Sequence, residues 1–190
     1  MKKWIAAILS MLMLLCPALA EEWVAFEEYA AKLAETYEGE WKGEGEIRVL
    51  TVEKNVSTVS VCLRGEDVAA VTVESVQNGT LVETALNALS GLGLLSDELL
   101  SSISTLEQGG ELVTDGFVVG RIAGETRECI YLAPEAGFDS YVWEPVHGGD
   151  QLHAEATCSG MDVPRLITPE AAEQTGYDLC DHCAKNAPEM

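Results

Sequence analysis

One histidine and three cysteines near the C-terminus constrain this chain more than any other feature. His153 and Cys158 lie close together, and the pair Cys180 and Cys183 follows after an intervening segment. Thiolate and neutral imidazole are ligands that zinc prefers, and four of them complete the tetrahedral shell of a structural site. The spacing therefore predicts a single Cys3His site that holds a structural Zn²⁺ ion and leaves no position open for a substrate.

Two alternatives and one further ligand compete with this interpretation. His182 lies between the paired cysteines and is a weaker candidate ligand than His153. Export favours oxidation, so Cys158, Cys180 and Cys183 are also candidates for a disulfide. A thiol-redox site would place the Cys-x-x-Cys pair at the start of a helix. Only a short segment follows Cys183, so the sequence predicts no helix there and disfavours redox catalysis.

The first residues have the three parts of a secretory signal peptide. Residues 1–3 are basic, residues 4–16 are apolar, and residues 18–20 read Ala-Leu-Ala. The apolar run is too short to span a bilayer. We expect residues 1–20 to be removed by cleavage after Ala20, leaving a secreted or extracytoplasmic protein. A signal this short is typical of bacteria.

The charge of the chain excludes several classes of partner. Its formal net charge is −21, and the predicted signal peptide contains two lysines and no acidic residue. Such a surface repels nucleic acid phosphates and anionic lipid, so we expect no nucleic-acid partner and no membrane contact after cleavage. Because 47% of the residues are hydrophobic, the chain can still bury a core.

Two cysteines stay outside the predicted metal site. Of the six cysteines, Cys16 lies in the predicted signal peptide, so an odd number remains and not all can pair within the chain. With three assigned to the metal, Cys62 and Cys129 are left as a possible disulfide. They are equally interpretable as buried thiols, which pack as small hydrophobic side chains.

The region before residue 134 has helical and strand patterns in a definite order. Apolar residues at three-and-four spacing predict an amphipathic helix over residues 22–37. Alternating β-branched residues predict three strands within residues 46–76, and their short joints indicate an antiparallel meander. Two more strands are predicted at about residues 116–122 and 126–132.

A pair of helices is predicted between these two groups of strands. Thr80 and Glu83 form a capping box for the first helix, and Ser96 is a good cap for the second. The elements add up to an α+β domain over residues 21–133. It has an N-terminal helix and an antiparallel sheet of about five strands, with the helix pair on one face.

Residues 134–140 are predicted to be a linker to a small module. A strand at residues 141–145, a tight turn at 147–150 and a returning strand at 151–156 predict a β-hairpin. His147 in this turn is expected to face water.

The module is predicted to cover residues 141–190. Thr168 suits the N-cap of a short helix and Gly176 its C-terminal end, after which the chain delivers Cys180 and Cys183. The core of such a small module would be limited, so metal binding would supply much of its folding free energy. Its main candidate core residues are Trp143, Leu152, Leu166, Ile167 and Tyr177.

The order of these residues resembles a known zinc module. From about residue 142 to 183, the chain is similar to a module at the C-termini of many exported bacterial proteins, and to the Ada-type metal-binding domain. The resemblance rests on His153, Cys158 and a short helix that precedes Gly176-Tyr177 and the Cys-x-x-Cys pair. It implies a bound zinc ion. Ada-type domains use four cysteines, whereas His153 takes the first place here, and the acidic charge argues against their DNA chemistry.

These features favour an exported, acidic, non-catalytic protein that binds a protein or small-molecule partner and carries a structural zinc module. No nucleophile, acid–base pair or phosphate-binding loop stands out in the sequence, although an enzyme is not excluded. One alternative is a secreted enzyme or thiol-redox protein whose C-terminal cysteines form a disulfide. Another is a metal-handling protein that exchanges its ion.

Overall fold

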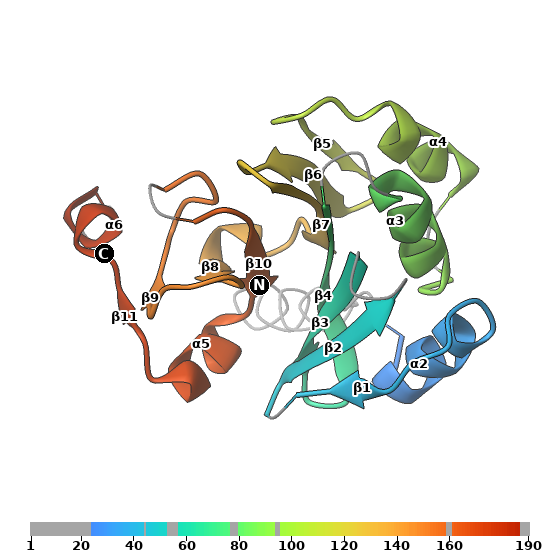
Figure 1. The fold of residues 1–190 in the computed structure, drawn as a ribbon, viewed down its shortest axis with the longest axis horizontal. Coiled ribbons are helices and arrows are strands. Elements are labelled where there is room, and N and C mark those ends of the chain that lie inside the picture. The colour runs from blue at the N-terminus through green and yellow to red at the C-terminus, as the bar shows by residue number, and fades with distance from the viewer. Residues whose placement is uncertain are drawn as a thin grey trace, which may run out of the picture.

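The computed structural model describes residues 24–43, 45–52, 57–76, 80–93, 96–158 and 161–186. The predicted signal peptide and its cleavage site lie outside these residues. At the centre of the described fold is an antiparallel sheet of seven strands in the order β1-β2-β3-β4-β7-β6-β5 (Figure 1). Among the described residues, no helix combines the length and the apolar character needed to cross a membrane.

The sheet contains the strands that the sequence predicts and two more at its edges. β2, β3 and β4 form the predicted meander, and β7 returns beside β4. The additional strands β1 and β5 are short edge strands, which is why an alternation pattern did not reveal them. The strands are β1 (Trp41–Lys42), β2 (Ile47–Val52), β3 (Ser57–Arg64), β4 (Asp67–Val76), β5 (Glu111–Thr114), β6 (Phe117–Ala123) and β7 (Arg127–Pro134).

Three helices cover one face of the sheet, as predicted (Figure 1). They are α2 (Phe26–Ala34), α3 (Leu81–Ser90) and α4 (Asp97–Thr105). Ser96 caps α4, because its hydroxyl accepts a hydrogen bond from the N–H of Leu99 at 3.1 Å. The buried sides of the three helices and one face of the sheet share a hydrophobic core that includes Leu33, Val59, Leu89, Ile103 and Leu132.

The C-terminal segment, described over residues 138–158 and 161–186, packs on the opposite side of the sheet (Figure 1). A second hydrophobic core joins Cys62, Ala70 and Cys129 of the sheet to Trp143 and Ile167 of this segment. The sheet is therefore the middle layer of three, and β4 and β7 are buried along most of their length. The elements of the segment are η2 (Phe138–Ser140), β8 (Val142–Pro145), β9 (Gln151–Leu152), β10 (Pro164–Ile167), α5 (Pro169–Thr175), β11 (Asp178–Leu179) and α6 (Asp181–Asn186).

The stretch predicted to be a linker takes part in this packing. The ring of Phe138 stacks on that of Tyr131 with 6.2 Å between centroids. Directly after this stretch, the hydroxyl of Tyr141 donates a hydrogen bond to the carbonyl oxygen of Ala69 at 3.0 Å. The division of the chain at residues 134–140 stays a prediction, and residues from both sides of it contribute to the second core.

The predicted hairpin of the module is reduced to a single antiparallel bridge between Trp143 and His153. Strand β8 instead pairs along its whole length with β10. Helix α5 begins and ends as the sequence predicts: Thr168 accepts a hydrogen bond from the N–H of Ala171 at 3.2 Å, and Gly176 has left-handed φ. Of the predicted core residues of the module, Tyr177 is 39% exposed and the other four are buried.

Candidate metal centre

The structure brings the four predicted ligands together. One donor atom from each of His153, Cys158, Cys180 and Cys183 lies within 4.8 Å of the others, and all four residues are buried. They gather at the end of the C-terminal segment that is farthest from the helices of the sheet (Figure 1). His182, the weaker candidate ligand, is exposed and does not belong to this cluster.

Two short parallel strands position the ligands. Leu152 at the end of β9 pairs with Leu179 at the end of β11, so the next residue of each strand, His153 or Cys180, enters the cluster. The N–H of Cys180 donates to the carbonyl oxygen of Leu152 at 2.9 Å and fixes this register. The structure therefore joins two ligand pairs that α5 separates in the chain.

The surroundings of the thiols differ from one to the next. The N–H of Cys183 donates a hydrogen bond to Cys180 Sγ at 3.3 Å and lowers the pKa of the Cys180 thiol. Burial raises the pKa of the Cys158 thiol to about 12. A bound divalent cation favours the deprotonated form of every thiol that it contacts. The thiol of Cys180 therefore loses its proton more readily than that of Cys158, and a bound cation would favour the deprotonation of Cys158.

His153 offers a nitrogen that fits a metal. Burial lowers the pKa of its imidazole, which favours the neutral form that binds metal ions. Its Nδ1 atom is buried and has no hydrogen-bond partner in the part of the chain that the structure describes. A buried polar atom without a partner costs about 1–3 kcal/mol. Coordination of a metal would remove this cost.

The sulfur spacing fits a shared ion better than a disulfide. Cys158 Sγ and Cys180 Sγ lie 3.6 Å apart. Two sulfurs bound to one tetrahedral zinc are separated by about 3.8 Å, whereas a disulfide bond measures about 2.05 Å. All the cysteines in the described ranges are free thiols. The donor set and its spacing are therefore compatible with Zn²⁺.

The prediction that no helix follows the Cys-x-x-Cys pair is wrong. Helix α6, a helix of six residues, begins at Asp181, directly after Cys180. The sequence argument took the short C-terminal tail as too small for a helix, yet one turn and a half fits there. The pair still lies against Cys158 and His153, an arrangement of four donors rather than of an isolated dithiol.

The possible disulfide between Cys62 and Cys129 is not formed, because β4 lies between their strands. Cys62 on β3 is opposite Ala70, and Cys129 on β7 is opposite Glu74. Two strand spacings separate the cysteines by at least about 10 Å, whereas a disulfide needs Cα atoms within about 7 Å. Burial raises the pKa of both thiols. They are the buried hydrophobic thiols of the alternative interpretation.

Sequence reasoning missed an ion cluster around the buried carboxylate of Glu74. Glu74 on β4 is only 2% exposed and pairs with Arg127 on β7. His147 is exposed, as expected, and its Nε2 atom lies 2.6 Å from the same carboxylate oxygen of Glu74. These residues are far apart in the chain, and no local pattern marks them. Their contacts help to hold the C-terminal segment on the sheet.

Comparisons with protein-family models, with curated proteins and with solved structures found no match to this chain. The structure therefore shows the four-donor cluster of the predicted module, and no family match identifies an Ada-type domain.

Proposed function

We propose that this chain is an exported, acidic, non-catalytic binding protein in which a structural Zn²⁺ ion keeps the C-terminal segment on the sheet. The observation that carries the proposal is the buried cluster of His153, Cys158, Cys180 and Cys183, whose donor atoms lie within 4.8 Å of one another. Zinc would act there as a cross-link, since four protein ligands leave no position for substrate.

A cross-link at this position would act on the whole fold. The two ligand pairs flank β10 and α5, whose residues Leu166, Ile167 and Ala171 belong to the second core. An ion that joins the pairs would close the chain around this packed unit. Structural zinc contributes on the order of 10 kcal/mol of binding free energy in small zinc-dependent peptides. That magnitude is comparable to the total stability of a domain.

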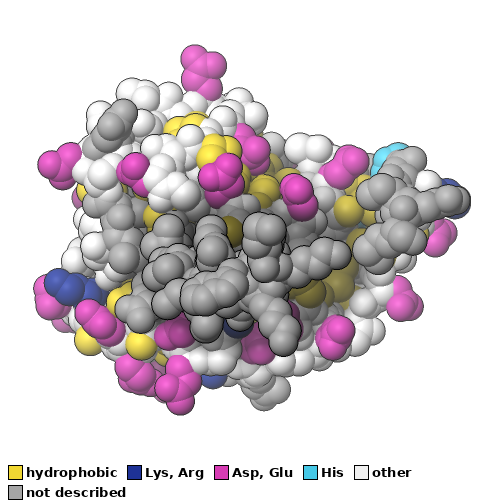
Figure 2. Space-filling view, turned by 180° about the vertical axis from the view of Figure 1, so that it is seen from behind, with side chains coloured by type: hydrophobic (Ala, Val, Ile, Leu, Met, Phe, Trp, Pro, Cys, Tyr) yellow, Lys and Arg dark blue, Asp and Glu magenta, His cyan; other side chains and the backbone are white. Residues whose placement is uncertain are grey.

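The proposed export and choice of partners rest on the sequence and the surface. The N-terminal pattern of residues 1–20 is that of a secretory signal. Figure 2 shows Asp and Glu side chains at many places in the described part of one face, with few Lys and Arg side chains among them. Such a surface attracts cationic groups and repels phosphates. We therefore propose a protein or small-molecule partner and no nucleic acid.

Native mass spectrometry of residues 21–190, purified without reductant or added metal, tests the proposal. We expect one zinc ion per chain in the wild-type protein and none in Cys158→Ser. Cys62→Ser is the matched control, because it removes a buried thiol outside the cluster and should keep the ion. A metal-free mass that is lower by about two hydrogens would support the disulfide alternative.

The metal-handling alternative predicts a different exchange rate. The four ligands are between 3% and 7% exposed, so a competing chelator cannot reach the ion without local opening. A structural site should therefore release zinc slowly to an excess of chelator. Release within the mixing time would favour metal handling.

A further inference from the structure

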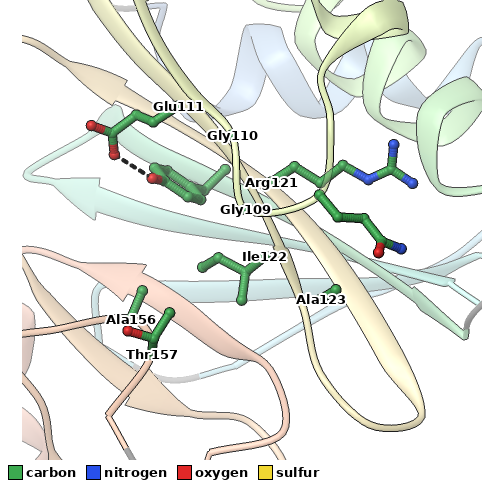
Figure 3. Close-up of a pocket in the computed structure, with 10 residues that line it drawn as sticks. Gly109, Gly110, Glu111, Arg121, Ile122, Ala123, Ala156 and Thr157 are labelled. Atoms are coloured by element: carbon green, nitrogen blue, oxygen red, sulfur yellow. Dashed lines mark hydrogen bonds between the residues drawn. The ribbon is translucent and has the colours of Figure 1, made fainter.

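A cavity of about 460 Å³ lies where the C-terminal segment meets the β5–β6 edge of the sheet (Figure 3). Its volume falls within the range of about 300–1,000 Å³ that is typical of small-molecule sites. Ile122 and Tyr131 line it from the sheet, and Ala156 and Thr157 from the C-terminal segment. Thr157 directly precedes the candidate ligand Cys158, so one wall of the cavity is anchored at the metal centre.

The acidic group of the cavity is Glu111 on β5. Its Oε2 atom accepts a hydrogen bond from the hydroxyl of Tyr131 at 2.5 Å, which Figure 3 shows as a dashed line. This bond orients the carboxylate and leaves Oε1 for another donor. A carboxylate held in this way at the edge of a partly apolar cavity favours a ligand that carries a positive charge.

Arg121 does not cancel this negative charge. Its guanidinium donates to Glu128 Oε2 at 2.7 Å and to the carbonyl oxygen of Leu106 at 3.1 Å. Figure 3 shows the side chain of Arg121 directed away from Glu111, toward the helices. Arg121 lines the cavity, and its guanidinium is already paired with Glu128 and Leu106.

The remainder of the cavity is suited to an apolar group. Ile122, Ala123 and Ala156 contribute aliphatic surface. The ring of Tyr131 lies over Gly120 so closely that a Cβ there would collide with it. Trp143 packs edge-on against the same ring at 4.8 Å between centroids, so the ring that positions Glu111 is held from two sides.

We propose that this cavity binds a small organic ammonium ion, with the ammonium group on Glu111 and an apolar body against Ile122 and Ala156. The inference deepens the proposed binding function by giving the ligand a chemical class. The acidic surface would raise the local concentration of such cations. Because Thr157 adjoins Cys158, loss of the zinc ion should loosen one wall and weaken binding.

Benzylammonium is a suitable probe, with benzoate as a matched anion of the same size. We would titrate each into the zinc-loaded protein and follow the methyl resonances of Ile122 and Ala156 by NMR. Benzylammonium should give saturable shifts, and benzoate should give none. Equal shifts with both probes, or no saturable shift with benzylammonium, would overturn the proposal.

Two variants separate the site from general charge. Glu111→Gln should weaken benzylammonium binding at least tenfold. Glu107→Gln removes the same charge from an exposed position outside the cavity lining and should leave the affinity unchanged. If both variants weakened benzylammonium binding equally, the probe would be attracted only by the overall negative charge. That result would contradict a specific site at Glu111.

The zinc proposal and the cavity proposal fail in distinguishable ways. One zinc ion per chain without benzylammonium binding would refute the cavity alone. Binding that depends on Glu111 in a protein found to contain no zinc would support the cavity and refute the structural ion. Weaker binding after Cys158→Ser, which should remove the ion, would support the link between the two sites.

Discussion

The hydroxyl of Thr126 donates a hydrogen bond to Asp162 Oδ2 at 2.7 Å, and this contact joins the C-terminal segment to the β6–β7 turn. Asp162 Oδ1 also accepts from the N–H groups of Glu125 at 2.7 Å and Thr126 at 3.3 Å. Gly124 in the same turn packs so close to Asp162 that a Cβ would collide with its carbonyl oxygen. Docking of the segment thus requires a turn with no side chain at residue 124.

Replacement of Asp162 by alanine should lower the free energy of unfolding by about 1–2 kcal/mol, because three hydrogen bonds to a carboxylate are lost. Urea denaturation of both proteins measures the difference. Asp139→Ala is the control, since it removes the same charge from an exposed residue and should change stability by less than about 0.5 kcal/mol. Equal effects of the two substitutions would show that the Asp162 contacts contribute nothing specific.

The contribution of Asp162 should depend on pH in a defined direction. The hydroxyl of Thr126, followed by the backbone N–H groups, holds the pKa of Asp162 below its usual range. The stabilisation is therefore present above the unfolded pKa of about 4 and is lost as pH falls through the lower folded value. The stability difference between wild type and Asp162→Ala should stay nearly constant from pH 7 to about pH 5 and shrink below that. A difference that disappears between pH 7 and pH 5 would contradict this account.

The two C-terminal histidines should differ in their effect on zinc. His153→Ala removes a buried candidate ligand and should weaken zinc binding by at least about 100-fold, because ligand changes exceed the 10–100-fold cost of outer-shell changes. His182→Ala, at an exposed position between the cysteines, should leave the affinity nearly unchanged. Competition with a chromophoric chelator measures both. If His182→Ala lost zinc and His153→Ala kept it, His182 would be the ligand in place of His153.

The buried carboxylate of Glu74 makes Arg127 important for stability. Arg127→Ala would leave Glu74 with His147 as its remaining ionic partner and should cost about 3 kcal/mol, in the range measured for broken buried pairs. The double variant Glu74→Leu with Arg127→Met should recover part of that loss, since it buries no unpaired charge. Denaturant unfolding of the three proteins checks this. A double variant that is less stable than Arg127→Ala would argue against it.

The sequence was most informative where function depends on local spacing and residue type. The two pairs of candidate ligands and the caps Ser96 and Thr168 could be identified because each pair and each cap is marked by residue types within a few positions. The helix after Cys180 and the edge strand at Glu111–Thr114 were missed, since short elements carry little periodic signal.

Long-range packing was harder to predict. Cys62, Ala70 and Cys129 lie on the face of the sheet opposite the helices, where the C-terminal segment buries them. Their apolar character was the available signal, because strands that are apolar on both faces are typical of sheets covered on both sides. No comparable pattern in the sequence indicated that His147 pairs with Glu74.

The reactivity of Cys62 and Cys129 tests most directly whether the ion holds the segment on the sheet. These thiols are 3% and 0% exposed beneath the C-terminal segment. Alkylation followed by peptide mass spectrometry would report each cysteine separately, before and after removal of zinc with a chelator. The account predicts that both thiols are protected in the zinc-loaded protein and are alkylated together with Cys158, Cys180 and Cys183 after chelation. Alkylation of the three ligand cysteines alone, with Cys62 and Cys129 still protected, would show that the segment stays docked without the ion and would contradict the account.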